Sequence, residues 1–176
     1  MKRIGIAGAS ECGKTTLSIH LSRAYWQLHK MPSLVLDPWK GEHRWGKQAW
    51  VTSDEKVFWA AVWKRKKDLV IVDDGSLTIA RDRELVPAFT AIRHQLHTLL
   101  VVCHGASDLL PTMRRQFNEL FLFAQNESDV ETWQHDLPLM RGISQATVVD
   151  GVCKLNPYEF VHCENYKDGV VQKLAL

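Results

Sequence analysis

Residues 8–16 combine glycines, a lysine and hydroxyl groups in a pattern that can hold the phosphates of a nucleotide. The match to GxxxxGK(S/T) runs through Gly8, Ala9, Ser10, Glu11, Cys12, Gly13, Lys14 and Thr15, and Thr16 follows it. In such a loop main-chain N–H groups curl around an anion, and the N-terminus of the next helix adds partial positive charge. The lysine reaches the outer phosphates, and the first threonine can bind Mg²⁺. We therefore expect residues 8–16 to bind Mg²⁺-ATP, with Lys14 catalytic, Thr15 on the metal and Thr16 as a further contact.

Two adjacent carboxylates end a short apolar run further along the chain. The run is Leu69 to Val72, and Asp73, Asp74 and Gly75 follow it. A strand that ends in two acids can bring one carboxylate to Mg²⁺ and the other to an attacking water. We expect Asp73 to bind the metal and Asp74 to polarise or deprotonate water. The alternative is a plain strand-ending turn, which is a common use of Asp and Gly.

A histidine follows the apolar run at residues 98–103, and an arginine precedes it. His104 would sit at the carboxyl end of a strand, where parallel sheets bind their ligands. We expect its ring to contact the γ-phosphate or the attacking water. The alternative is a buried, hydrogen-bonded histidine without catalytic duty. Arg93 is the arginine on the other side.

These residues need a parallel sheet to position them, and the sequence predicts one. Apolar runs rich in β-branched residues alternate with amphipathic segments, as is typical of βα units. We predict strands at residues 3–7, 33–36, 69–72, 98–103 and 120–123, and helices at residues 14–29, 54–67 and 128–137. The Trp- and Lys-rich residues 39–53 are interpreted as a loop. Residues 147–149, 159–163 and 170–174 look like short C-terminal strands.

Length and composition favour one globular domain. The 176 residues predict a single domain, with a core at about residues 3–138 and a β-rich extension at about residues 139–176. No apolar stretch approaches the roughly 20 residues that span a bilayer. The N-terminal residues run directly into a strand-like pattern, so we expect no signal peptide. The four cysteines are far apart, so we expect thiols and a cytoplasmic protein. A net charge of +2 gives no general sign of nucleic-acid binding.

Together these motifs resemble the FtsK/HerA superfamily of DNA-translocating ATPases, over about residues 3–138. In that superfamily an arginine precedes the fourth strand and a polar sensor residue, commonly Gln, ends it; Arg93 and His104 occupy those positions. Residues 111–116 and 120–123 are similar to its compact viral branch, the genome-packaging ATPases and zonular-occludens-toxin-like phage proteins. Two residues depart from the family pattern: the sensor is His, and the second acid is Asp rather than Glu.

The resemblance implies an α/β fold, the three-layer RecA/ASCE-like sandwich of P-loop NTPases, with a mainly parallel sheet of about five core strands plus short C-terminal strands. It implies an ATPase that translocates double-stranded DNA as a homo-oligomeric ring, a hexamer or a pentamer, in viral genome packaging. ATP sites would lie between subunits, with Arg93 as the first candidate for an arginine acting in trans and Arg114 and Arg115 as the next. A viral capsid or membrane protein would dock the motor in the host cytoplasm or virion.

Other readings of the sequence remain open. A small-molecule P-loop kinase would use Arg114 and Arg115 as lid arginines on the phosphates. A nucleotide-switch assembly protein would turn ATP over slowly. In the loop after residue 38, basic and aromatic residues alternate in a way that suits DNA contacts, although the tryptophans could instead pack on the domain. They are Trp39, Lys40, His43, Arg44, Trp45 and Lys47.

Overall fold

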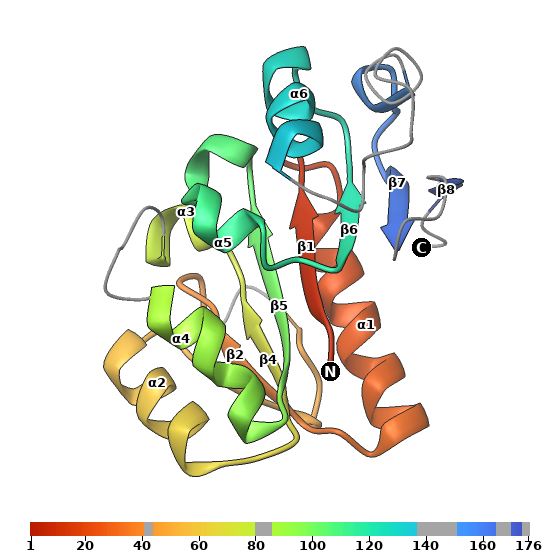
Figure 1. The fold of residues 1–176 in the computed structure, drawn as a ribbon. Helices are drawn as coiled ribbons and strands as arrows, with labels where there is room; N and C mark the ends of the chain where they lie inside the picture. Colours follow the sequence, from red (N-terminus) through yellow and green to blue (C-terminus); the bar gives the residue numbers. More distant parts are fainter. Residues whose placement is uncertain (41–43, 80–85, 137–150, 165–169, 174–176) are drawn as a thin grey trace.

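The strands of the described residues form one eight-stranded sheet in the order β3-β2-β4-β5-β1-β6-β7-β8 (Figure 1). The computed structural model describes residues 1–40, 44–79, 86–136, 151–164 and 170–173. The strands are β1 (Arg3–Ala7), β2 (Ser33–Leu36), β3 (Ala49–Thr52), β4 (Leu69–Val72), β5 (Thr98–Cys103), β6 (Glu119–Leu122), β7 (Glu159–Glu164) and β8 (Val170–Lys173). The helices are α1 (Lys14–His29), α2 (Glu55–Lys64), α3 (Gly75–Thr78), α4 (Val86–Ala91), α5 (Pro111–Arg114) and α6 (Glu127–Asp136), with 3-10 turns η2 (Ile92–Gln95) and η3 (Ala106–Asp108).

Helices cover both faces of the sheet and make three layers. The strands from β3 to β6 in the sheet order all run parallel, and β4 and β5 are completely buried. One core cluster joins the sheet to α2, α4, α5 and α6 through residues such as Phe58, Phe89 and Trp133. The opposite cluster joins it to α1 through Leu17 and also includes Trp45. The predicted three-layer α/β sandwich with a mainly parallel sheet is therefore confirmed.

One parallel strand was not predicted. β3 lies inside the segment interpreted as a loop, where it pairs with β2 at the edge of the sheet. Ala49, Trp50 and Val51 are partly or largely exposed, so this strand lacks the apolar run that marks a strand buried on both faces. The core therefore has one more parallel strand than the five expected from the sequence.

One helix prediction is corrected, and two other predictions fall partly or wholly outside the described residues; the helix predicted at residues 128–137 is otherwise observed as α6. The helix predicted to reach residue 67 ends at Lys64 because Arg65 takes an extended conformation and pairs with buried Asp68, whose Oδ2 lies 2.6 Å from Nε. The last residue of the predicted helix 128–137 and the predicted strand 147–149 lie outside the described residues.

The C-terminal strands continue the same sheet in the antiparallel sense. β7 pairs with β6, and β8 pairs with β7. The segment from residue 159 therefore lies beside β6, which is the neighbour of β1 in the sheet. The ring of His162 stacks on Phe121 with centroids 4.3 Å apart. His162 Nε2 also lies 2.9 Å from the carboxylate of Glu119. These contacts attach the C-terminal strands to the parallel core.

Two further sequence expectations can be compared with the described residues. None of the helices described is both long and apolar enough to cross a membrane. The four cysteines all lie in described residues, and none forms a disulfide.

Candidate functional site

The predicted site residues meet because β5 lies between β1 and β4 in the sheet. Ala7 at the end of β1 is level with Cys103 at the end of β5, and Val72 of β4 pairs with Val101. The loops that follow these three strands therefore leave the same edge of the sheet. They surround a cavity of about 530 Å³. Its lining is Ser10, Glu11, Lys14, Thr15, Trp39, Asp73, Asp74, Val102, Cys103 and His104.

Neighbouring strands hold the phosphate loop in place. The N–H of Gly8 donates to the carbonyl oxygens of Cys103 and His104 at 3.3 and 3.2 Å, and the N–H of Ala9 donates to Ala124 at 3.0 Å. Gly13 has φ 106°, a left-handed conformation that favours glycine, and α1 begins at the next residue. The loop thus leads directly into the N-terminus of a 16-residue helix, as an anion-binding site requires.

Lys14 folds back into the loop that precedes it. Its Nζ donates to the carbonyl oxygens of Gly8 at 2.8 Å and Ala9 at 2.6 Å. The same Nζ lies 3.5 Å from Nδ1 of His104. Neutral carbonyl oxygens therefore hold the ammonium group at the cavity. Charged phosphate oxygens are stronger acceptors and can replace them.

Thr15 and Asp73 supply oxygen atoms that fit Mg²⁺. The Thr15 hydroxyl donates to the Asp73 carboxylate, with its Oγ1 at 3.1 and 3.3 Å from the two oxygens. Asp73 is only 2% exposed. Within the described ranges no group of three His, Cys, Asp or Glu side chains could hold a metal ion. Mg²⁺ needs no such group, because it uses one or two protein oxygens together with phosphates and water.

Asp74 and His104 lie next to each other in the lining of the cavity. Asp74 has φ 51° at the turn into α3, and the Ser76 hydroxyl donates to its Oδ1. His104 Nε2 lies 3.6 Å from the same oxygen, so the imidazole stands between an acid and the Lys14 ammonium. The His104 side chain is 43% exposed and lines the cavity, unlike the buried histidine of the alternative reading.

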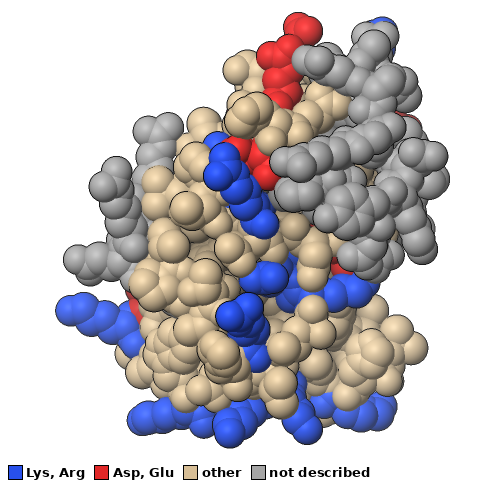
Figure 2. Space-filling model, viewed as in Figure 1, with Lys and Arg blue, Asp and Glu red and all other residues tan. Residues whose placement is uncertain are grey.

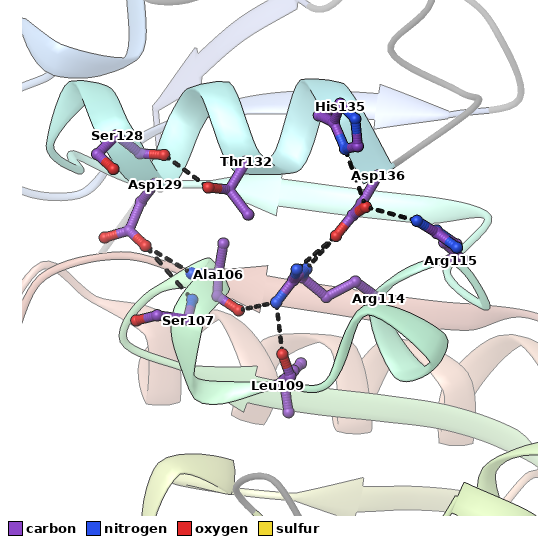
Figure 3. A network of polar contacts seen from close by, with 10 residues as sticks. All are labelled: Ala106, Ser107, Leu109, Arg114, Arg115, Ser128, Asp129, Thr132, His135 and Asp136. Atoms are coloured by element: carbon purple, nitrogen blue, oxygen red, sulfur yellow. Dashed lines mark hydrogen bonds and ion pairs between the residues drawn. The ribbon is translucent and has the colours of Figure 1, made fainter.

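Two carboxylates fix the backbone that carries His104. Asp108 Oδ2 accepts from the N–H groups of His104 and Gly105, both at 2.9 Å. Asp129 of α6 accepts from the N–H of Ala106 at 2.9 Å (Figure 3). A side chain on Gly105 would collide with Asp129, whose Oδ2 is 2.7 Å from where a Cβ would lie. The N–H groups of residues 104–106 thus donate to the carboxylates of Asp108 and Asp129, and these hydrogen bonds fix the position of the His104 backbone.

Arg114 and Arg115 share one carboxylate but differ in exposure. Nε of Arg114 donates to Asp136 Oδ2 at 2.7 Å, and its Nη1 donates to the carbonyl oxygens of Ala106, at 2.7 Å, and Leu109 (Figure 3). Arg115 reaches Asp136 Oδ1 at 3.2 Å. The Arg114 side chain is 8% exposed and that of Arg115 is 55% exposed. The Arg114 guanidinium is thus buried and bonded within its own chain, so it is not available to contact the site of a second subunit.

The ion pair also determines the protonation of Asp136. Burial opposes ionisation, but hydrogen bonds from Arg114, His135 and Arg115 outweigh it and hold the pKa of Asp136 below its ordinary value. The carboxylate therefore stays charged at neutral pH and ties α6 to α5.

Of the four residues predicted to be catalytic, Arg93 is the one that does not line the cavity. It lies in η2, before β5, and so at the opposite end of that strand from His104. Six strand residues span roughly 20 Å. Burial, and after it the charge of Arg93, lowers the pKa of Arg3. Figure 2 shows Lys and Arg side chains gathered along the lower edge of the same view.

Asp37, at the end of β2, was not predicted as a site residue. It is completely buried, and its two oxygens accept from the N–H of Trp39 and from Nε1 of Trp45, both at 2.8 Å. Trp45 packs in the core, whereas Trp39 is exposed at the rim of the cavity. The segment 39–47 therefore divides between packing and exposure, and His43 lies outside the described residues.

Comparisons with known proteins agree with the fold. No protein-family model matches the sequence, and no curated protein matches it. The genome packaging NTPase B204 from Sulfolobus turreted icosahedral virus 2, solved with sulfate, is 20% identical with a TM-score of 0.78, over 99% of this chain and 97% of that chain. Its complex with AMPPCP gives 17% identity and a TM-score of 0.74, over 98% and 97%. The N-terminal domain of zonular occludens toxin from Neisseria meningitidis gives 13% identity and a TM-score of 0.54, over 100% and 95%. The chain therefore has the P-loop NTPase fold, and its structural neighbours are the kinds of protein that the sequence motifs resemble.

Proposed function

We propose that the protein is an ATPase that hydrolyses Mg²⁺-ATP in the cavity beside the phosphate loop. One observation carries this proposal. A single cavity is lined by five polar side chains that follow three different strands: Lys14, Thr15, Asp73, Asp74 and His104. They supply the cation, the metal-side oxygens, the acid and the polar sensor that phosphoryl transfer to water requires.

The residues have separate roles in this mechanism. Loop N–H groups and Lys14 bind the phosphates, and the ammonium exchanges the carbonyl oxygens of Gly8 and Ala9 for phosphate oxygens. Thr15 and Asp73 would hold Mg²⁺, which would neutralise charge on the phosphates. Asp74 accepts the proton of the attacking water, and the His104 ring beside it orients that water or the γ-phosphate.

We further propose that hydrolysis moves double-stranded DNA through a homo-oligomeric ring during viral genome packaging. Solved structures with the same fold are described as a genome packaging NTPase and as the DNA-packaging ATPase from Sulfolobus turreted icosahedral virus. The position of Arg93 is compatible with a ring, because it is exposed at the end of β5 away from its own cavity and would therefore act on the site of another subunit. A capsid or membrane protein would dock the ring, in the host cytoplasm or in the virion.

The test is the ATPase rate and the oligomeric state, each measured with and without double-stranded DNA, with Lys14→Ala as the inactive control. The proposal predicts turnover that DNA stimulates in an oligomer, and no turnover in the control. A monomer whose ATPase rate ignores DNA would contradict the motor while leaving the ATPase intact. Phosphate transfer to a small acceptor would support the kinase reading, against which stands the engagement of Arg114 with Asp136.

A further inference from the structure

A second cavity, of about 740 Å³, lies on the other side of the phosphate loop. It shares Glu11, Lys14 and Thr15 with the first cavity, so the two meet around the loop. The second cavity is completed by Gly13, Thr16, Ile19, Arg44, Pro157 and Tyr158. Neither the acids after β4 nor His104 line it, and the chemistry described above leaves it without a role.

The direction of a bound triphosphate follows from the first cavity. In a loop of this kind the lysine reaches the outer phosphates, and the main-chain N–H groups hold the inner ones. The outer end must lie beside Asp74 and His104, because these residues flank Lys14 in the first cavity. The nucleoside must then leave the loop at its other end, past Thr16, where the second cavity opens.

The C-terminal segment brings an aromatic ring to this second cavity. The N–H of Glu159 donates to the carbonyl oxygen of Asn156 at 3.1 Å, and the Glu159 carboxylate accepts from the Asn156 side chain at 2.9 Å. Pro157 is second in this turn, and Tyr158 is third with φ 66°. A proline followed by a positive φ is the pattern of a type II turn, whose third position normally holds Gly or Asn. A tyrosine is therefore held in a conformation that is unfavourable for it.

Tyr158 also makes direct contact with the phosphate loop. Its N–H donates to the carbonyl oxygen of Cys12 at 3.0 Å. Its ring packs on Gly13, where a Cβ would lie 2.6 Å from Cδ1. Strained conformations persist where surrounding contacts hold them, and they concentrate at binding sites. The strained residue here is an aromatic side chain beside the route that a nucleoside would take.

We propose that Tyr158 is the platform on which the base of a bound purine nucleoside triphosphate stacks, with the Arg44 guanidinium as a second planar contact. This inference rests on the proposed function, since it locates the nucleoside of the same nucleotide. Aromatic rings and guanidinium planes bind the flat face of a base, and every base has such a face. ATP and GTP should therefore bind with affinities within roughly tenfold of each other. The C-terminal strands acquire a role in nucleotide binding, because β7 follows directly from this turn.

The experiment compares ATP with inorganic tripolyphosphate, which has no base. Binding of each to the full chain is measured by calorimetry with Mg²⁺ present, for the wild type, Tyr158→Asn and Tyr158→Phe, and binding of GTP to the wild type is measured in the same way. Asn tolerates a positive φ, so Tyr158→Asn removes the ring and preserves the turn. We expect it to bind ATP about 5- to 100-fold more weakly and tripolyphosphate with an affinity within about twofold of the wild type. Tyr158→Phe keeps the ring and should recover most of the lost ATP affinity.

Each other outcome overturns the inference in a recognisable way. Unchanged ATP binding by Tyr158→Asn would mean that no base stacks on the ring. Equal weakening of ATP and tripolyphosphate would mean that Tyr158 only supports the loop. A preference between ATP and GTP well above tenfold would mean that base edges are read instead of faces. If the wild-type protein binds neither ligand, the proposed function itself is contradicted, and the inference with it.

Discussion

Replacement of Arg114 by Met should destabilise the protein far more than the same replacement of Arg115. Both guanidinium groups contact the carboxylate of Asp136, so the two substitutions remove the same kind of partner from the same acid. They differ in burial, because the Arg114 side chain is 8% exposed and the Arg115 side chain is 55% exposed. Arg114 also donates to the carbonyl oxygens of Ala106 and Leu109. Arg114→Met therefore removes a hydrogen-bond donor from three buried acceptors, namely the Asp136 carboxylate and the carbonyl oxygens of Ala106 and Leu109.

The expected magnitudes follow from this difference. Removing one partner of a buried ion pair costs about 3–5 kcal/mol in the free energy of unfolding, because the remaining charge stays desolvated. An exposed pair such as that of Arg115 contributes about 0–1 kcal/mol. For a domain of this length, each kcal/mol lowers Tm by roughly 2–4 °C. Arg114→Met should therefore lower Tm by roughly 6–20 °C, and Arg115→Met by at most about 4 °C.

The assay is thermal and urea unfolding of the wild type and both variants at pH 7, followed by circular dichroism. Arg115→Met serves as the control for loss of one positive charge near Asp136. Equal losses of stability in the two variants would refute the argument from burial. So would a loss below about 1 kcal/mol in Arg114→Met, because the carboxylate would then not depend on that guanidinium.

Three further predictions concern chemistry, pH and assembly. Asp74→Asn should bind Mg²⁺-ATP as the wild type does and hydrolyse it about 10²- to 10⁴-fold more slowly, and single-turnover rates at wild-type level would remove Asp74 from catalysis. Burial opposes the ionisation of Asp136 and Glu119, but hydrogen bonds from basic neighbours outweigh it, so both pKa values lie below their ordinary values. The two carboxylates therefore stabilise the fold fully above the ordinary carboxyl pKa, and this stabilisation is lost as pH falls through the lowered pKa values. Urea titrations should accordingly show stability declining below about pH 4, and a main decline near pH 6 would point to histidine instead. Arg93→Ala should retain ATP binding and lose about 10³- to 10⁵-fold in turnover, and mixing it with Lys14→Ala should restore activity; an inert mixture would argue against an arginine in trans.

The parallel core was predictable because its strands are buried on both faces. Residues 69–72 and 98–103 form continuous apolar runs, and the structure keeps both boundaries. β3 escaped prediction because an edge strand with exposed Trp50 has no such run. The attachment of β7 to β6 was equally hidden, since strand signals in a sequence do not state their partners.

The candidate site divides in the same way. Lys14 and Thr15 were identified because a phosphate loop is contiguous, and Asp73 because a strand end is a local signal. Tyr158 was missed because it contacts Cys12 and Gly13, which are distant in the chain. Asp37 was missed although its partners Trp39 and Trp45 lie within eight residues, because no sequence motif marks the turn that it holds. Asn156-Pro157 indicates a turn, but nothing near it in the sequence indicates that this turn rests on the phosphate loop.

Calorimetry of Mg²⁺-ATP binding to the wild type and to Lys14→Ala shows whether the phosphate loop binds a nucleotide. We expect one nucleotide bound per wild-type chain and a large loss of affinity in the variant, because the buried ammonium beside Gly8 and Ala9 is the main cation for the phosphates. Wild-type protein that binds no nucleotide, or a variant that binds as tightly as the wild type, would contradict this expectation.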